Sequence, residues 1–126
     1  MMNDAERAEQ QARVERYLQK WVEPLGLSNW RFRYFYYGGP YKDGNGAVKE
    51  NRLASCEPNW PYMIADLRFD LSEVGSKDEQ VEETVIHELL HCILSECEVE
   101  EVDHEERVAT MLARAFLRAI ASLGER

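Results

Sequence analysis

The chain is poor in the residues that mark several large protein classes. It has three cysteines, Cys56, Cys92 and Cys97. This odd and widely spaced set argues against a disulfide framework and for reduced thiols. No apolar run reaches about 18 residues, so we expect no transmembrane helix. The N-terminus lacks the basic start and apolar core of a signal peptide, and no internal repeat is present. We therefore expect a cytoplasmic protein with no membrane partner.

Basic residues are outnumbered by acidic ones. The chain has 15 Lys and Arg against 24 Asp and Glu, a net charge of -9. A negative charge of this size repels phosphate backbones, so we expect no nucleic-acid partner. Hydrophobic residues make up 44% of the 126 residues, which is typical of a folded protein and sufficient for one domain spanning residues 1–126.

Hydrophobic periodicity predicts an α+β domain rather than an alternating βαβ fold. We expect helices over residues 4–23, from just after Ser76 to about 95, and over about 104–122. Strands are expected over 30–37 and 62–71, with a weaker one near 50–57. Capping boxes are predicted at the starts of the first two helices, from Asn3 with Glu6 and from Ser76 with Glu79.

The strand over residues 62–71 has one apolar and one charged face. Asp66, Arg68 and Asp70 alternate with apolar residues, as in a strand with one side in water. Alternating charges also protect exposed sheet edges, so we expect this strand to lie at an edge.

The second predicted helix contains the sequence His87-Glu88-Leu89-Leu90-His91, an H-E-x-x-H motif. Residues four apart lie above one another on a helix, so His87 and His91 can bind one metal ion. Glu88 is rotated by about 100° from His87, where it can reach a water beside the metal and act as general base. The surrounding helix is apolar, and unpaired imidazoles are costly in such surroundings.

A catalytic zinc site needs a third protein ligand. Cys97 follows His91 by six residues, but Leu94 stands where a metzincin has glycine, so we interpret Cys97 as an ordinary thiol. We interpret Cys56 and Cys92 as small buried apolar residues. The last helix offers three candidates. Its predicted apolar stripe, at 108, 111, 112, 115, 116 and 119, ranks them Glu105, then His104, then Glu106.

The motif and the order of elements resemble the gluzincin-type zincins. The resemblance is greatest to minigluzincins and to short phage or bacterial metallopeptidases related to the SprT-like and ImmA-like groups. It covers the opening helix, the Trp30 strand, the Ala65–Leu71 strand, V-x-x-x-V-I-H-E-L-L-H at 81–91, and E-E-R-V-A-T-M-L-A-R-A at 105–115. It implies a zincin-like fold and a Zn²⁺-dependent peptidase, with ligands His87, His91 and Glu105 and with Glu88 as general base.

This resemblance also implies how a substrate binds. Peptide or protein substrates would pair as an extended strand with a sheet edge, which we place at 62–71. An oxyanion donor is needed as well, and the sequence leaves five candidates open: Tyr34, Tyr36, Tyr41, Tyr62 and Arg68.

Two other functions remain open. The zinc could be structural, with His104 joining Glu105 in a closed site, or the substrate could be something other than a peptide. Seven acidic residues and no Lys or Arg lie within residues 96–106, so much of the net charge is next to the predicted third ligand. This acidity would favour a cation and basic substrates.

Overall fold

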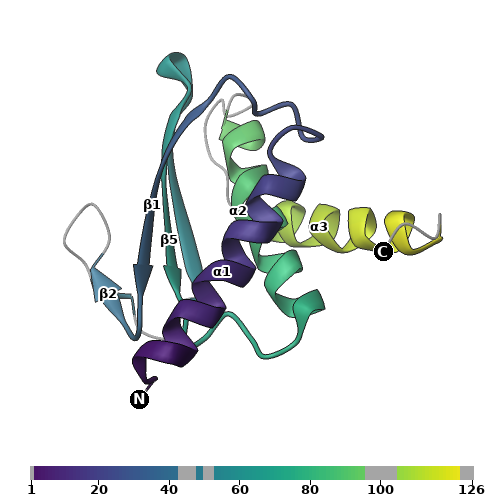
Figure 1. Ribbon diagram of the computed structural model, residues 1–126. Helices are drawn as coiled ribbons and strands as arrows, with labels where there is room; N and C mark the ends of the chain where they lie inside the picture. The colour runs from purple at the N-terminus through teal and green to yellow at the C-terminus, as the bar shows by residue number, and fades with distance from the viewer. Residues whose placement is uncertain (1, 43–47, 50–52, 96–104, 123–126) are drawn as a thin grey trace.

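The computed structural model describes residues 2–42, 48–49, 53–95 and 105–122 (Figure 1). This part of the chain is α+β, as the sequence predicts. Its helices are α1 (Asp4–Trp21), α2 (Asp78–Ser95) and α3 (Glu105–Ser122), with a single 3₁₀ turn at Trp60–Tyr62. Its strands are β1 (Arg31–Tyr37), β2 (Tyr41–Lys42), β3 (Val48–Lys49), β4 (Ala54–Asn59) and β5 (Ile64–Asp70).

The main sheet has the strand order β1-β5-β4, and β2 pairs with β3 separately. Strand β5 is therefore central, parallel to β1 and antiparallel to β4. The prediction that residues 62–71 form a sheet edge is wrong. The edges are β1 and β4, and β4 contains Pro58, a residue that sheets tolerate mainly in edge strands.

Two of the charges on β5, Asp66 and Arg68, are explained by pairing across the sheet, while Asp70 accepts from the amide and hydroxyl of Ser72. Asp66 accepts two hydrogen bonds from Arg33 of β1, both of 2.8 Å. Arg68 bonds to Glu57 of β4 and lies over the ring of Phe35. Asp66 and Arg68 thus connect three strands on one face of the sheet. Sequence alone cannot distinguish this from edge protection, because both give the same alternation.

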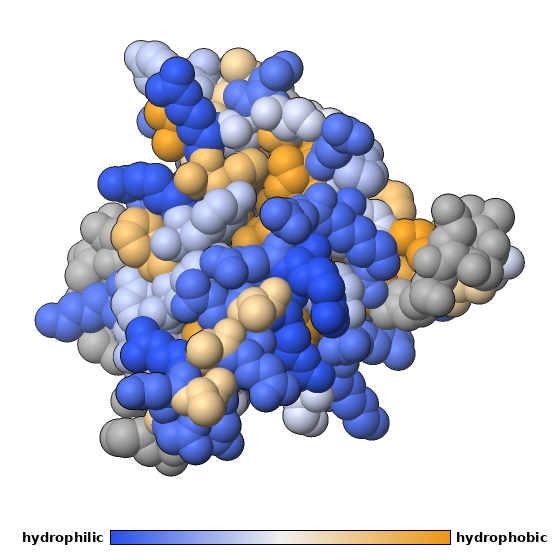
Figure 2. Space-filling view, in the orientation of Figure 1, coloured by the Kyte–Doolittle hydropathy of each residue, from blue (hydrophilic) through white to orange (hydrophobic). Residues whose placement is uncertain are grey.

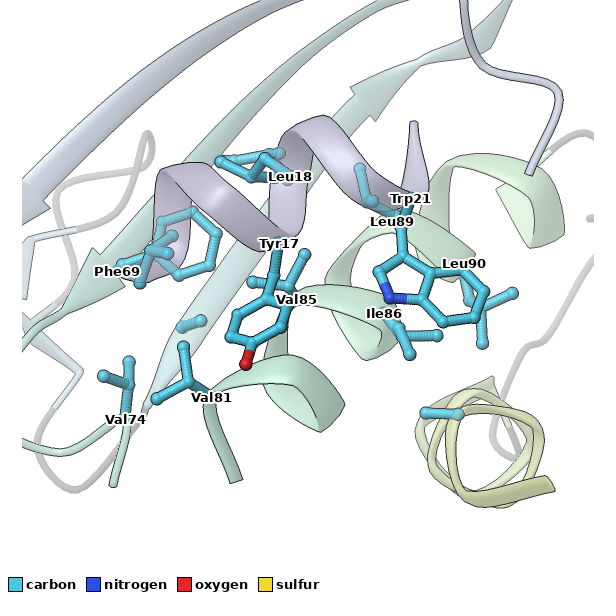
Figure 3. Packing of buried hydrophobic residues seen from close by; sticks show 14 of the residues in the cluster. Tyr17, Leu18, Trp21, Phe69, Val74, Val81, Val85, Ile86, Leu89 and Leu90 are labelled. Atoms are coloured by element: carbon cyan, nitrogen blue, oxygen red, sulfur yellow. The ribbon is translucent and has the colours of Figure 1, made fainter. Parts of the chain in front are cut away.

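Helices α1 and α2 cover the other face of the sheet (Figure 1). Figure 3 shows their shared core, in which Tyr17, Leu18 and Trp21 of α1 meet Phe69 of β5 and the apolar face of α2. The predicted capping box of α1 is confirmed. Asn3 Oδ1 accepts from the Glu6 amide at 2.8 Å, and Glu6 Oε1 accepts from the Asn3 amide at 3.0 Å.

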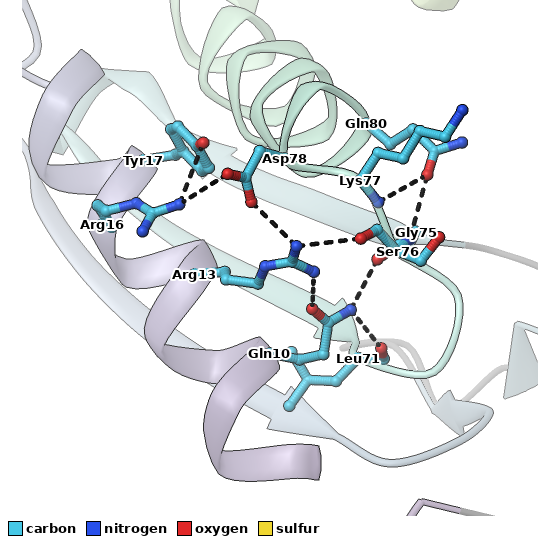
Figure 4. Close-up of polar contacts among 10 residues, drawn as sticks. All are labelled: Gln10, Arg13, Arg16, Tyr17, Leu71, Gly75, Ser76, Lys77, Asp78 and Gln80. Atoms are coloured by element: carbon cyan, nitrogen blue, oxygen red, sulfur yellow. Dashed lines mark hydrogen bonds and ion pairs between the residues drawn. The ribbon is translucent and has the colours of Figure 1, made fainter.

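The start of α2 differs from its prediction. The side chain of Gln80, rather than Glu79, accepts hydrogen bonds from the backbone amides of Ser76 and Lys77, both at 3.1 Å (Figure 4). The helix begins at Asp78, so the capping arrangement lies one residue beyond the predicted Ser76 box. Asp78 itself forms ion pairs with Arg13 and Arg16 of α1.

A buried carboxylate joins α1 to α2 deeper in the core. Glu82 Oε2 accepts hydrogen bonds from Lys20 Nζ and Trp21 Nε1, both at 2.7 Å. Glu82 is 2% exposed, so its charge is held away from water by these α1 partners. This contact fixes how α2, which carries the H-E-x-x-H motif, sits against α1.

Helix α3 packs on α2, and its inner face differs from the predicted stripe. Met111, which was expected inside, is 53% exposed. The side chains that pack into the core are Ala109, Leu112, Ala113, Phe116, Leu117 and Ile120. At 100° per residue, these six centre about 90° from the predicted stripe. The reason is close packing, because Ala109 and Ala113 let α3 approach α2.

The face seen in Figure 2 is mostly hydrophilic, with small separate apolar areas. Within the described residues, no helix is both long and apolar enough to span a bilayer.

Candidate metal centre

The H-E-x-x-H residues lie in the middle of α2, where the helix is packed between the sheet and α3. His91 and Glu88 are buried, at 7% and 6% exposure, and His87 is half-buried. The two imidazoles meet edge to face, with ring centroids 5.0 Å apart. Their Nε2 atoms are 3.3 Å apart. The helical spacing therefore brings the same nitrogen of each ring to one point, as the motif predicts.

This separation can be tested against zinc geometry. Two nitrogens bound to one tetrahedral zinc ion, each about 2.0–2.1 Å from it, are about 3.3–3.4 Å apart. The His87 and His91 nitrogens already stand at that separation. Neutral imidazole nitrogens are also among the donors that zinc prefers. Without a metal, the same approach is an N–H···N hydrogen bond, so one ring donates and the other accepts.

The second nitrogen of His87 is held by α3. Thr110 Oγ1 lies 3.0 Å from His87 Nδ1. When Nε2 of a neutral imidazole binds a metal, Nδ1 carries the proton and needs an acceptor. The Thr110 hydroxyl can supply that acceptor, so the contact suits His87 as a ligand through Nε2.

Thr110 was missed by sequence reasoning. The available signal was a hydroxyl residue one turn after the acidic start of a helix that is otherwise rich in alanine and leucine. That signal becomes specific only once the contact between α2 and α3 is known.

A pocket of about 360 Å³ opens beside these residues. Its floor comes from α2, and its walls come from the start of β4 and from α3. The lining residues are Leu53, Ala54, Glu83, Thr84, His87, Glu88, Thr110 and Arg114. Glu88 and His87 therefore face one concave space, which the sequence-based role of Glu88 requires.

Arg114 supplies positive charge to this pocket. Its Nε donates to Glu83 Oε1 at 3.1 Å, and its side chain is 59% exposed. Of the described lining residues, Arg114 alone carries a cation. It can therefore meet negative charge on a bound molecule from the α3 side.

The five predicted oxyanion candidates lie elsewhere, and none of them lines this pocket. Tyr41 is buried and its hydroxyl donates to Ser55 Oγ at 2.9 Å, while Arg68 is bound to Glu57. Tyr62 is exposed in the 3₁₀ turn. Tyr34 and Tyr36 line a separate hollow against α1.

The predicted third ligands fall where the structure describes no side chains. Residue 104 and the side chains of 105 and 106 lie outside the described part of the chain, as does Cys97. Within the described residues, no group of three His, Cys, Asp or Glu side chains is placed to hold a metal. The structure thus brings two of the predicted ligands together and leaves the third as a prediction.

A further hollow, of about 630 Å³, has a different character. It lies between α1 and the segment after β5, and its lining includes Glu6, Glu9 and Glu73 but neither histidine nor cysteine. It offers no imidazole or thiolate for a zinc ion.

Comparisons with family models, with curated proteins and with solved structures found no match.

Proposed function

We propose that this protein is a zinc-dependent hydrolase that cleaves peptide bonds. The observation that carries the proposal is the 3.3 Å approach of His87 Nε2 to His91 Nε2, with Thr110 on the opposite nitrogen of His87. The buried Glu88 beside the same pocket adds the base that such a reaction needs. The gluzincin-like sequence pattern agrees with this chemistry, and the odd number of widely spaced cysteines agrees with a cytoplasmic location.

We propose a carboxylate at the start of α3 as the third ligand. The sequence-based ranking favoured Glu105, but it used an apolar stripe that the structure corrects. Glu106 precedes Thr110 by four residues, so the helical repeat gives both positions the same face. The Thr110 contact identifies that face as the one toward His87. Position 105 is about 140° away from position 110, so we now favour Glu106.

Each residue of the site would have a separate role in the reaction. His87, His91 and the α3 carboxylate would hold the zinc, whose charge polarises a substrate carbonyl and makes a nearby water more acidic. Glu88 accepts a proton as the water attacks the carbonyl carbon, and then donates that proton to the departing amine. Thr110 keeps the His87 ring oriented through Nδ1.

The substrate would pair with β4 rather than with 62–71. Among the described strands, β4 pairs only with β5, which leaves its outer edge for an extended peptide. Leu53 and Ala54, at the start of this edge, line the pocket with His87 and Glu88. A peptide along β4 would therefore run into the pocket that contains the proposed base.

The direct test compares wild type with Glu88→Gln. Both proteins should bind about one zinc ion per chain, because Glu88 is not a ligand. Wild type should cleave members of a diverse peptide library, with products identified by mass spectrometry. The variant should lose about 100-fold or more of that rate.

Two results would contradict the proposal. If wild type holds no more zinc than a His87→Ala/His91→Ala double variant, the two histidines do not form a metal site. Equal cleavage rates for wild type and Glu88→Gln would contradict the role of Glu88 as general base. Stoichiometric zinc with no cleavage of any library peptide would instead favour a structural site or a non-peptide substrate.

A further inference from the structure

Two cysteines far apart in the sequence meet beside the motif helix. Cys56 Sγ of β4 and Cys92 Sγ of α2 are 3.6 Å apart, across 36 positions of sequence. Both are reduced cysteines in this structure. This contact refines the prediction that each is a small buried apolar residue. Cys92 is 0% exposed, as expected, but Cys56 is only half-buried.

Sheet register explains why the sulfurs meet. Cys56 is opposite Leu67 of β5, a core residue on the helix-covered face. Its side chain therefore extends toward α2, which packs across β4. A disulfide bond is about 2.0 Å long, so the sulfurs need to close by about 1.5 Å. Rotation of the two side chains with a small approach of β4 to α2 would achieve this.

We propose that Cys56 and Cys92 form a redox-modification site that reacts with a peroxide to give an internal disulfide. The difference in burial sets the order of events. Cys56 is half-buried, whereas Cys92 is fully enclosed, so a peroxide from solvent meets Cys56 before Cys92. Cys56 is therefore the residue that reacts first, and Cys92 is the residue that resolves the product.

The reaction balances in two steps. The Cys56 sulfur attacks one oxygen of hydrogen peroxide and breaks the O–O bond, which gives a sulfenic acid and one water. The Cys92 sulfur then attacks the Cys56 sulfur, the S–O bond breaks, and a second water leaves. Two thiols are oxidised by two electrons in total, and one peroxide is reduced to two waters.

The disulfide would connect the floor of the pocket, on α2, to its β4 wall. Cys92 follows His91 directly in α2, and Cys56 is two residues after Ala54, which lines the pocket. The modification site is defined by the two sulfurs alone, so it stands whether or not the protein is a hydrolase.

The test uses the Cys97→Ser variant, so that only the proposed pair can react. The folded protein is treated with hydrogen peroxide, alkylated and digested without reductant. We expect a linked peptide containing Cys56 and Cys92 that separates on reduction. Peptide mapping is needed rather than intact mass, because the exposed Met111 can also gain oxygen.

Two further variants test the order of reaction. In Cys92→Ser/Cys97→Ser, Cys56 should stop at the sulfenic acid and be trapped by dimedone. In Cys56→Ser/Cys97→Ser, the enclosed Cys92 should stay reduced while the protein is folded. Absence of the linked peptide in folded Cys97→Ser, or its formation only in denaturant, would overturn the proposal. Equal dimedone trapping at Cys56 and Cys92 in the two double variants would overturn the order.

Discussion

Thr110 on α3 contacts His87 on α2 through the ring nitrogen that faces away from His91, with 3.0 Å between Oγ1 and Nδ1. This single contact connects the packing of α3 to the orientation of a proposed zinc ligand. It also fixes which nitrogen of His87 is turned toward His91.

Replacing this hydroxyl should weaken zinc binding without unfolding the protein. Thr110→Val keeps the shape of the side chain but removes the hydroxyl contact to His87 Nδ1, and we expect about a 10- to 100-fold loss of zinc affinity. Thr110→Ser keeps the hydroxyl and should stay near wild type. Competition with a zinc chelator measures both, with circular dichroism as the folding control. Equal affinity for the Val and Ser variants would show that Thr110 plays no part in metal binding.

The third ligand can be assigned by alanine substitution at the start of α3. We expect Glu106→Ala to lower zinc affinity more than about 100-fold. This exceeds the loss expected from replacing a residue that contacts a ligand without binding the metal itself. Glu105→Ala and His104→Ala are control variants at neighbouring positions, and they should change zinc affinity far less. Chelator competition ranks all three variants in one assay. A loss confined to Glu105→Ala would restore the assignment made from sequence.

The buried carboxylate of Glu82 should be important for stability. Glu82→Ala leaves the Trp21 N–H buried without this acceptor, and we expect about 1–3 kcal/mol less stability in urea unfolding. Glu83→Ala is the matched control one residue along, because its partner Arg114 is exposed. That pair should contribute about 0–1 kcal/mol. Similar losses for both variants would contradict a special role for Glu82.

The burial of Tyr36 should make the folded protein less stable at alkaline pH. Its hydroxyl is buried without a hydrogen-bond partner, and burial raises its pKa above the usual value. An unfolded tyrosine releases its proton near pH 10, but the folded one holds it longer, so the unfolded state gains stability as pH rises. The contribution of Tyr36 is therefore intact below about pH 10 and is lost above it.

The Tyr36→Phe variant isolates this effect. It should equal or exceed wild-type stability at pH 7, since it removes an unpaired buried hydroxyl. Above about pH 10 it should lose less stability than wild type. Urea unfolding across pH 7–11 tests this, with the exposed Tyr62→Phe as control. An identical alkaline decline in wild type and Tyr36→Phe would contradict it.

Most local signals in the sequence were reliable, although the Ser76 capping box was placed one residue too early. The Asn3 capping box, the strand at 30–37 and the helix around His87 depend on neighbours within a few residues, and all three are present. The meeting of His87 with His91 is equally local, because helical geometry alone brings residues four apart together.

Interactions between distant segments were not predictable in the same way. The central position of β5 depends on β1 and β4, whose pairing leaves no trace in the 62–71 pattern. The inner face of α3 was misassigned because Met111 is more hydrophobic than Ala109, yet close packing on α2 selects the smaller residue. Thr110 was missed for the same reason, since its partner is on another helix.

The position of β5 between a near and a distant partner also bears on how the chain folds. The short turn at Trp60–Tyr62 connects β4 to β5. The chain between β1 and β5 is longer than any of the three described helices. Contacts between close segments form at a lower entropic cost, so the β4–β5 hairpin with α2 should condense before β1 and α1 dock. The segment that carries His87, Glu88 and His91 would then take shape first, and the N-terminal helix would close over it last.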